Sequence, residues 1–318
     1  MRNLVLLFVG WFIQICLWGQ ELNFRHLSVE NGLSSNHITD VLQDSIGFIW
    51  IATANGLNRY DGYEVEVVDG TNGQGDLASS VTNCLASDTR GNVWIGTRRG
   101  LSVWDTRVAA MAIFSLDGNA NSFYNIGDIY IDQQDGVWVL AEQGGFHLFL
   151  KRANETNFRR IFFLKDPPGD SKGFYGSIVE DRDGNIWVGT SRRGLWRVDS
   201  KDLPFQEELW DPAAPLITSL YFDVHTGGLW VGTLSGLYRK KLPHSKAEEV
   251  PLFNKQIIRS VYAGTHPDQL FIGTDDQGLF SFNTSTGTYT KYGYQLEVPT
   301  SLRHNAITAI YHDKQGIL

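Results

Sequence analysis

Apolar and polar residues alternate in short runs along most of this chain, and the runs form a repeating unit. They are rich in Val, Ile, Trp, Phe and Tyr, which favour β-strands, and Gly, Asp and Asn separate them. A helical repeat would show a period of 3.6 residues rather than two. Aligned on one aromatic residue, successive copies lie 41 to 49 residues apart, at Trp50, Trp94, Trp138, Trp187, Trp230 and Phe271.

Each unit divides into four predicted strands. The inner strand, such as 38–43, is followed by a turn with Asp and Gly, and the second strand carries the aromatic residue and often ends in Gly-Thr. A further glycine then makes a hairpin to the third strand, and the fourth, outer strand varies most. Four strands in about 40 to 50 residues are typical of one β-propeller blade.

The two ends of the repeat array suggest how the ring closes. A seventh copy begins at 307–313, and residues 22–27 resemble an outer strand that would complete the last blade. We therefore expect an all-β fold, a β-propeller with a seven-bladed plan and four-stranded antiparallel blades. Its last blade is expected to be incomplete in this chain, with residues 20–318 comprising six full repeats and the start of a seventh, truncated at the C-terminus.

The first residues differ from the repeats. Arg2 precedes an almost wholly apolar run, and Gly19 stands before Gln20, which predicts a secretory signal peptide over residues 1–19. The alternative is an uncleaved anchor, although the run is shorter than a membrane span requires. Removal of the signal leaves Cys84 as the single cysteine, so no internal disulfide is expected, and a buried thiol is the favoured interpretation.

Composition narrows the classes of partner. Apolar residues make up 42% and charged residues 19% of the chain, a globular balance, and the formal net charge is −8. A nucleic-acid partner is not expected for this segment, because no basic cluster offsets that charge. The histidines show no metal-ligand spacing and the recurring aspartates are interpreted as turn formers, so neither a metal nor another cofactor is expected.

The residues of the first copy resemble the two-component regulator propeller repeat. The resemblance rests on Gly32-Leu33-Ser34-Ser35-Asn36, Ile38-Thr39, Asp44, Gly47-Phe48-Ile49-Trp50-Ile51-Ala52-Thr53 and Gly56-Leu57-Asn58-Arg59-Tyr60-Asp61-Gly62, and on the later Gly-Asn-Val/Ile-Trp-Ile/Val-Gly-Thr strings. It implies the amino-terminal periplasmic sensor region of a hybrid two-component sensor histidine kinase. It also implies detection of an oligosaccharide and control of polysaccharide-utilisation genes. The kinase activity would belong to C-terminal sequence outside these 318 residues, so this segment is expected not to be an enzyme.

Propeller geometry predicts where a ligand would bind. Hairpins between second and third strands share one face with the connections that enter each inner strand, and variable loops on a regular scaffold often carry recognition. Arg98-Arg99 and Arg192-Arg193 could bind an acidic sugar; the favoured alternative is solvated arginines or ion pairs with Glu142 and Asp275. The candidate ligand-binding residues are Asn36, His37, Asn55, Arg98, Arg99, Glu142, Gln143, Tyr175, Arg192, Arg193, Asp275, Asp276, His304 and Asn305.

Two other functions stay open. One is a periplasmic propeller lyase of the streptogramin-cleaving type, for which His37 and His304 could be neighbours across the ring closure. The other is a passive protein-interaction propeller. The expected partners are an oligosaccharide or another small periplasmic ligand, the downstream domains of the same polypeptide, and a second copy in a homodimer.

Overall fold

The computed structural model describes residues 22–68, 77–119, 122–165, 176–190, 194–199, 205–207, 216–242, 245–313, 315 and 318. The predicted signal peptide and three candidate site residues, Tyr175, Arg192 and Arg193, lie outside the described residues.

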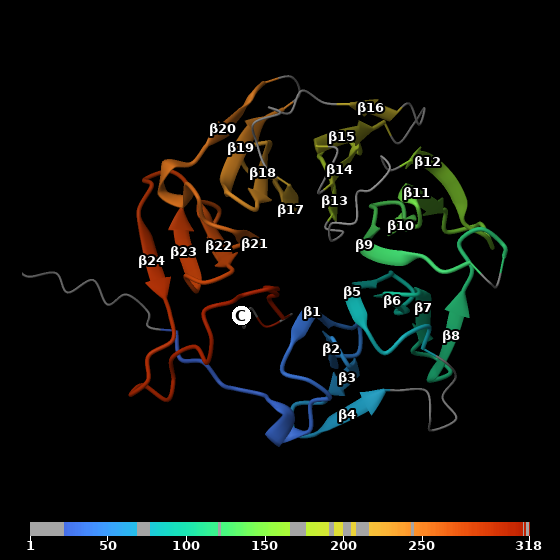
Figure 1. Cartoon of the computed structure of the whole chain (residues 1–318), viewed down its shortest axis with the longest axis horizontal. Helices are drawn as coiled ribbons and strands as arrows, with labels where there is room; N and C mark the ends of the chain where they lie inside the picture. Colours follow the sequence, from blue (N-terminus) through green and yellow to red (C-terminus); the bar gives the residue numbers. More distant parts are fainter. Residues whose placement is uncertain are drawn as a thin grey trace, which may run out of the picture.

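The described strands form six separate four-stranded antiparallel sheets arranged around a central axis (Figure 1). Each sheet is one blade, and its strands follow one another in chain order from the axis outward. Blades one to three contain β1 (Ile38–Gln43), β2 (Ile49–Thr53), β3 (Gly56–Tyr60) and β4 (Val65–Val68); β5 (Thr82–Ser87), β6 (Val93–Thr97), β7 (Gly100–Asp105) and β8 (Ala110–Phe114); and β9 (Asn125–Ile131), β10 (Val137–Glu142), β11 (Gly145–Lys151) and β12 (Arg159–Lys165).

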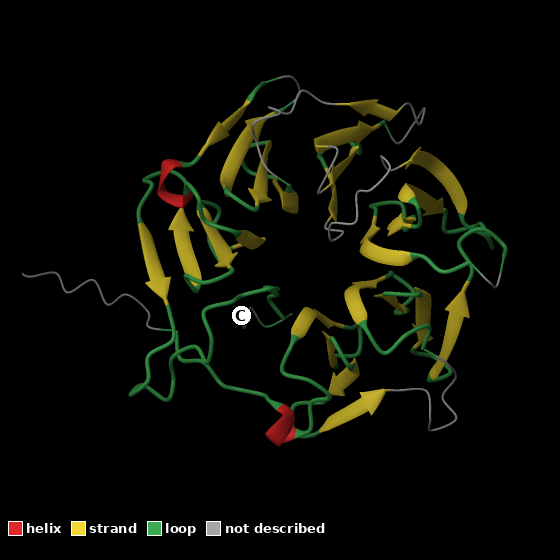
Figure 2. Cartoon of the chain, in the orientation of Figure 1, coloured by secondary structure: helices red, strands yellow, loops and turns green. Residues whose placement is uncertain are grey.

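Blades four to six repeat the arrangement. They contain β13 (Gly176–Glu180), β14 (Ile186–Thr190), β15 (Gly194–Val198) and β16 (Phe205–Glu207); β17 (Ile217–Asp223), β18 (Gly228–Thr233), β19 (Gly236–Lys241) and β20 (Ala247–Glu249); and β21 (Ile258–Ala263), β22 (Gln269–Thr274), β23 (Leu279–Asn283) and β24 (Tyr289–Tyr292). The helical segments described are two single 3₁₀ turns, η1 (Val29–Asn31) and η2 (Pro251–Phe253), which lie between blades (Figure 2).

The repeated aromatic residues lie between neighbouring blades, as an inter-blade core requires. Trp50 of blade one packs in one cluster with Leu85, Val93 and Ile95 of blade two. Trp94, Trp138 and Trp230 occupy the same kind of position toward blades three, four and six. These large apolar side chains are almost fully buried, so they are a main source of the free energy that holds the blades together.

Small residues let the inner strands approach closely. A Cβ on Gly232 would lie 2.8 Å from Ile258 Cγ2 of the next blade, and one on Gly96 would lie 2.7 Å from Ile126 Cγ2. The Gly-Thr ending of the second strand is therefore a packing requirement: glycine leaves room for an isoleucine near the start of the neighbouring inner strand.

The expectation of seven blades is wrong for the described residues, which form six. Residues 306–313 enter the sector between blades six and one but have no strand partner, since a strand requires a paired neighbour. They still make inner-strand contacts: Ile307 N–H donates to Thr274 O at 2.9 Å and Thr308 Oγ1 donates to Ile38 O at 2.9 Å.

The amino-terminal segment lies at the outside of the same sector (Figure 1). Phe24 N–H donates to Thr300 O at 3.0 Å, and the Phe24 ring meets Tyr292 of β24 edge-on at 6.1 Å. Residues 22–27 are not a strand, in contrast to the outer strand expected, but the two ends of the repeat array do meet here.

Candidate ligand-binding site

Five of the six inner strands contain a β-bulge near their first residue. The bulge skips Thr39, Asn83, Gly127, Thr218 and Arg259 in the pairing with the second strand. A bulged residue leaves the ladder, so its side chain is turned away from the sheet. All five of these residues line one central cavity of about 1130 Å³.

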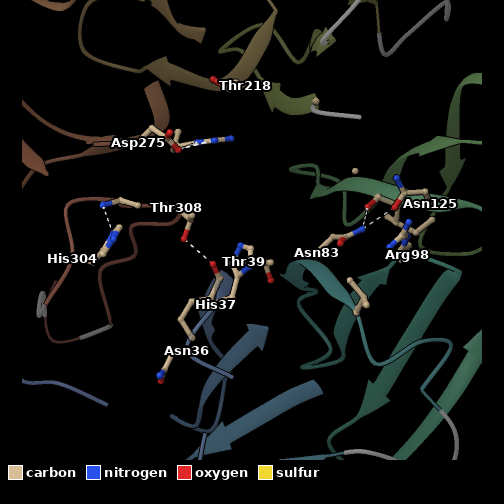
Figure 3. A pocket seen from close by; sticks show the side chains of 17 residues that line it. Asn36, His37, Thr39, Asn83, Arg98, Asn125, Thr218, Asp275, His304 and Thr308 are labelled. Carbon is tan, nitrogen blue, oxygen red and sulfur yellow. Dashed lines mark hydrogen bonds and ion pairs between the residues drawn. The ribbon is translucent and has the colours of Figure 1, made fainter. Parts of the chain in front are cut away.

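This cavity, the channel mouth, is lined by polar side chains of five blades around the axis (Figure 3), and blade four contributes Gly176. Its lining also includes inner-strand and hairpin residues, and the whole set is Asn36, His37, Ile38, Thr39, Val81, Asn83, Arg98, Asn125, Ile126, Gly127, Gly176, Thr218, Arg259, Asp275, His304, Ala306 and Thr308. The volume is slightly above the usual range for small-molecule sites, about 300 to 1000 Å³.

Side chains of the bulged residues also bridge neighbouring blades. Thr39 Oγ1 donates to Thr82 O at 2.8 Å, Asn83 Nδ2 donates to Ile126 O at 2.8 Å, and Thr218 Oγ1 donates to Ile258 O at 2.5 Å. The Thr308–Ile38 bond is the same contact across the sector between blades six and one. In blades one, two and five, the bulged residue therefore both faces the channel mouth and bonds to the next blade.

The channel mouth contains five of the predicted residues. Asn36, His37, Arg98, Asp275 and His304 line it, which confirms that inner-strand entries and hairpins share one face. A backbone bond explains this: Arg98 N–H in the hairpin donates to Val81 O in the entry at 2.9 Å, and Ala54 N–H donates to His37 O at 3.0 Å.

The remaining described candidates are not among the lining residues. Arg99 lies over the Phe123 ring with 4.5 Å from Cζ to the ring centroid, and Gln143 Nε2 donates to Phe123 O at 3.1 Å. Asn305 Oδ1 accepts Tyr294 N–H at 2.8 Å, which fixes a loop. Asn55 and Asp276 lie on hairpins and Glu142 is the last residue of β10, and none of the three is among the lining residues.

None of the five bulged residues is among the candidates predicted from the sequence. Asn83 and Asn125 form a polar pair at 3.0 Å near Arg98, whose side chain is exposed (Figure 3). Across the cavity, Arg259 forms an ion pair with Asp275, with 2.7 Å between Nη2 and Oδ1. Asp275 is therefore paired with an arginine of its own blade.

Two carboxyl groups lie just behind the channel lining. Asp40 Oδ2 accepts Leu85 N–H at 2.7 Å and Asp128 Oδ2 accepts Ile178 N–H at 2.6 Å, each from the next blade. Burial raises the pKa of Asp40 to about 7, although hydrogen bonds from the backbone N–H groups of Leu85 and Val41 oppose the shift. Burial likewise raises the pKa of Asp128 to about 7, with a contribution from the charge of Asp40.

Among the described residues, no group of three or more His, Cys, Asp or Glu side chains is arranged to hold a metal ion. Cys84 is buried without a disulfide, and burial raises the pKa of its thiol. The groups at the channel mouth are chiefly hydrogen-bonding amides, hydroxyls and imidazoles, together with two guanidinium groups and one carboxylate.

Comparison with known proteins supports the sequence resemblance. The profile of the two-component regulator propeller matches residues 32–55, 76–99 and 169–192. At these three segments the chain is similar to the two-component regulator propeller repeat. A "Histidine kinase P4" of Formosa agariphila is 37% identical over 73 residues, which cover 21% of this chain and 5% of that kinase. The matched part is thus a small share of that relative's length.

Solved structures share the propeller fold. The extracellular domain of a hybrid two-component system of B. thetaiotaomicron superposes with a TM-score of 0.76 at 19% identity, covering 93% of this chain and 40% of that one. The virginiamycin B lyase of Staphylococcus aureus gives a TM-score of 0.61 at 16% identity, covering 82% and 86%. At identities of 19% and 16%, the similarity of this chain to the two structures is evidence for a shared fold alone. No helix in the described part of the chain is long and apolar enough to cross a membrane.

Proposed function

We propose that this chain is the periplasmic ligand-sensing propeller of a two-component sensor and that it binds an oligosaccharide at the channel mouth. The observation that carries the proposal is the ring of bulged residues, which line one cavity from five blades. Four of them contribute a side chain, and Gly127 contributes its backbone. Bulges are over-represented where a site needs a side chain aimed out of a sheet.

The chemistry of the lining suits a sugar. A hydroxyl group both donates and accepts hydrogen bonds, and Asn, Thr and neutral His side chains offer both functions. Asn83, Asn125, Thr39 and Thr308 present such groups around the cavity. The volume of about 1130 Å³ leaves room for more than one sugar ring.

The matched repeat and the kinase relative support a role in signalling. In this proposal the chain itself is not an enzyme: binding would be passed to a histidine kinase elsewhere on the same polypeptide, which would regulate polysaccharide-utilisation genes. A second copy of the chain is a further proposed partner, since transfer of a signal needs an assembly with two states.

Calorimetry of the purified chain against a panel of neutral and acidic oligosaccharides tests the proposal. We expect one class to bind, and Asn83→Ala to weaken it by roughly tenfold through loss of a buried hydrogen bond. Arg107→Ala is the control, because Arg107 pairs with Asp105 at the turn beyond the third strand, outside the cavity lining. Equal affinity in both variants would contradict a site at the channel mouth.

The same panel separates the sensor from a lyase. A lyase would convert its substrate, and substitution of His304, which lines the cavity, would abolish turnover. Binding without any change in the covalent structure of the ligand favours the sensor.

A further inference from the structure

The tryptophan of blade five is held differently from those of blades one to four. In those four blades the indole Nε1 donates to the aspartate six residues earlier, at 2.8 to 3.1 Å. The turn of blade five is one residue longer, so Asp223 stands seven residues before Trp230. Asp223 accepts His225 N–H, Thr226 N–H and the Thr226 hydroxyl instead. Trp230 Nε1 is buried and has no hydrogen-bond partner among the described residues.

A second buried donor lies beside this indole. Arg239 of β19 pairs with Trp230 of β18 in the sheet register, and its Cζ lies 5.2 Å from the centroid of the Trp230 ring. Its Nε is buried and, in the part of the chain that the structure describes, also has no hydrogen-bond partner. At the same register position of blade one, Arg59 forms an ion pair with Glu66 at 2.5 Å. Because a buried donor without an acceptor is costly, both groups favour an acceptor that reaches them.

Blade three shows which group such a pair of donors accommodates. Asp132 Oδ2 accepts Trp138 Nε1–H and Arg152 Nη1–H there, each at 2.8 Å. The carboxylate lies beside Gly136, since a Cβ on this glycine would lie 2.6 Å from Asp132 Oδ2. In this fold, therefore, one carboxylate beside a glycine bonds to an indole and a guanidinium together.

The corresponding space in blade five has room for such a group. Gly228 stands two residues before the tryptophan of its blade, as Gly136 does in blade three. Apart from the adjacent residues, the atoms nearest to a Cβ on Gly228 would be Lys240 O at 3.4 Å, Thr226 Oγ1 at 3.5 Å and Arg239 Nε at 3.7 Å. The side chain of Asp223 is thus not among the groups that fill this space, in contrast to that of Asp132 in blade three.

We propose that blade five binds a small carboxylate anion beside Gly228, with Trp230 Nε1–H and the Arg239 guanidinium as its donors. The positive charge of Arg239 favours an anion over water, and the two oxygens of a carboxylate can accept from the two donors. Arg239 is partly exposed, so the anion can reach the guanidinium from solvent. The site adjoins the turn between β17 and β18, on the face opposite the channel mouth, and it does not depend on the proposed binding of an oligosaccharide.

NMR of the isotope-labelled full chain tests the site through its indole N–H signals. Sodium formate is titrated at constant ionic strength, and Trp230→Phe identifies the signal of Trp230. We expect this signal to shift saturably with a dissociation constant on the order of 10 mM. The signals of Trp50, Trp94 and Trp138 should stay in place, because their indoles already donate to aspartates. Formamide, which has a similar shape and no charge, should produce no saturable shift.

Two variants test the donors and the space separately. Arg239→Gln should weaken formate binding roughly tenfold or more, whereas its matched control Arg59→Gln should leave the affinity unchanged. Gly228→Ala adds a methyl group at ordinary contact distances, so this chain should fold and still bind formate roughly fivefold more weakly. It provides the test if Arg239→Gln does not fold.

The proposal would be overturned by the absence of a saturable shift of the Trp230 signal, which would leave water as the acceptor. Parallel shifts of all indole signals would overturn it as well, since they indicate a general effect of salt. So would an affinity for formate that Gly228→Ala, or a folded Arg239→Gln chain, leaves unchanged. Oligosaccharide binding is not the readout, so failure here is distinct from failure of the sensor function.

Discussion

Asp44 and Trp50 are joined by a buried hydrogen bond of 2.8 Å from the indole Nε1 to Oδ2. The other carboxylate oxygen accepts the backbone N–H groups of Ile46, Gly47 and Phe48, which close the turn between the first two strands. The same aspartate-to-tryptophan bond recurs between Asp88 and Trp94, Asp132 and Trp138, and Asp181 and Trp187. One side chain therefore fixes both the turn and the inter-blade aromatic residue of its blade.

Asp44→Ala is expected to lower the free energy of unfolding by about 2 to 4 kcal/mol, because it leaves several buried donors without an acceptor. Chemical denaturation of the variant and the parent chain measures the change. Asp61→Ala is the matched control: Asp61 also caps a turn, but it is exposed, and the expected loss is below about 1 kcal/mol. Similar losses in both variants would show that the indole bond contributes nothing.

The two buried carboxyl groups predict a pH dependence of stability. Asp40 and Asp128 each have a pKa of about 7 in the folded chain, above the value near 4 of an unfolded aspartate. The folded state then holds more protons than the unfolded state between about pH 4 and 7. Their contribution to stability is thus fully present below about pH 4 and is lost as the pH rises to 7.

In the double variant Asp40→Asn/Asp128→Asn, the free energy of unfolding should depend less on pH over this range. The amides do not titrate, and each keeps an oxygen that accepts Leu85 N–H or Ile178 N–H. Each group changes the free energy of unfolding by up to about 1.4 kcal/mol per pH unit. Denaturant unfolding at several pH values between 5 and 7 measures this slope. Asp105→Asn is the control: Arg107 lowers the pKa of Asp105 to about 2, so its titration lies outside this window. An unchanged slope in the double variant would refute the assignment.

Close packing at the Gly-Thr ending predicts a specific cost. Gly232→Ala places a Cβ 2.8 Å from Ile258 Cγ2, and the crowding should lower the free energy of unfolding by about 1 to 3 kcal/mol. Gly293→Ala is the control, because the nearest atom to its new Cβ, Asn305 Oδ1, lies at 3.4 Å. Thermal unfolding of the two variants should therefore differ in midpoint, and equal midpoints would contradict the packing argument.

Arg98 predicts a preference among ligands. Its exposed guanidinium lines the channel mouth beside the Asn83–Asn125 pair and can form two hydrogen bonds with a carboxylate or sulfate group. Arg98→Ala should weaken binding of an acidic oligosaccharide by tenfold or more and leave its neutral counterpart within about twofold. Parallel calorimetry with the two sugars measures this, and an equal loss for both would show that Arg98 does not read charge.

Much of the fold could be predicted because the aromatic residue, the aspartate turn and the Gly-Thr ending recur at nearly constant spacing. The recurring aspartates were expected to form turns, and the structure confirms this for Asp44. The recurring aromatic position, as at Trp50 and Trp94, lies between neighbouring blades. The predicted number of blades was wrong. Residues 307–313 have the sequence pattern of an inner strand, but no described residues form a second strand that pairs with them. Periodicity indicates what a segment can form, and pairing decides what it forms.

The site was only partly predictable. His37, Arg98 and His304 were found because strand direction places entries and hairpins on one face. Thr39, Asn83 and Arg259 were missed because a β-bulge shifts the pairing by one residue and reverses which side chain faces the channel. The alternation of apolar and polar residues does not mark such a shift, although five of the six blades carry it at the same position.

The most direct test of the central claim is a crystal structure of the chain with the tightest-binding oligosaccharide from the panel. The account predicts the sugar at the channel mouth, with hydrogen bonds to Asn83 or Asn125 and to at least one bulged residue of another blade. A sugar bound on the outer strands, or on the face that carries the Asp-Gly turns, would contradict it.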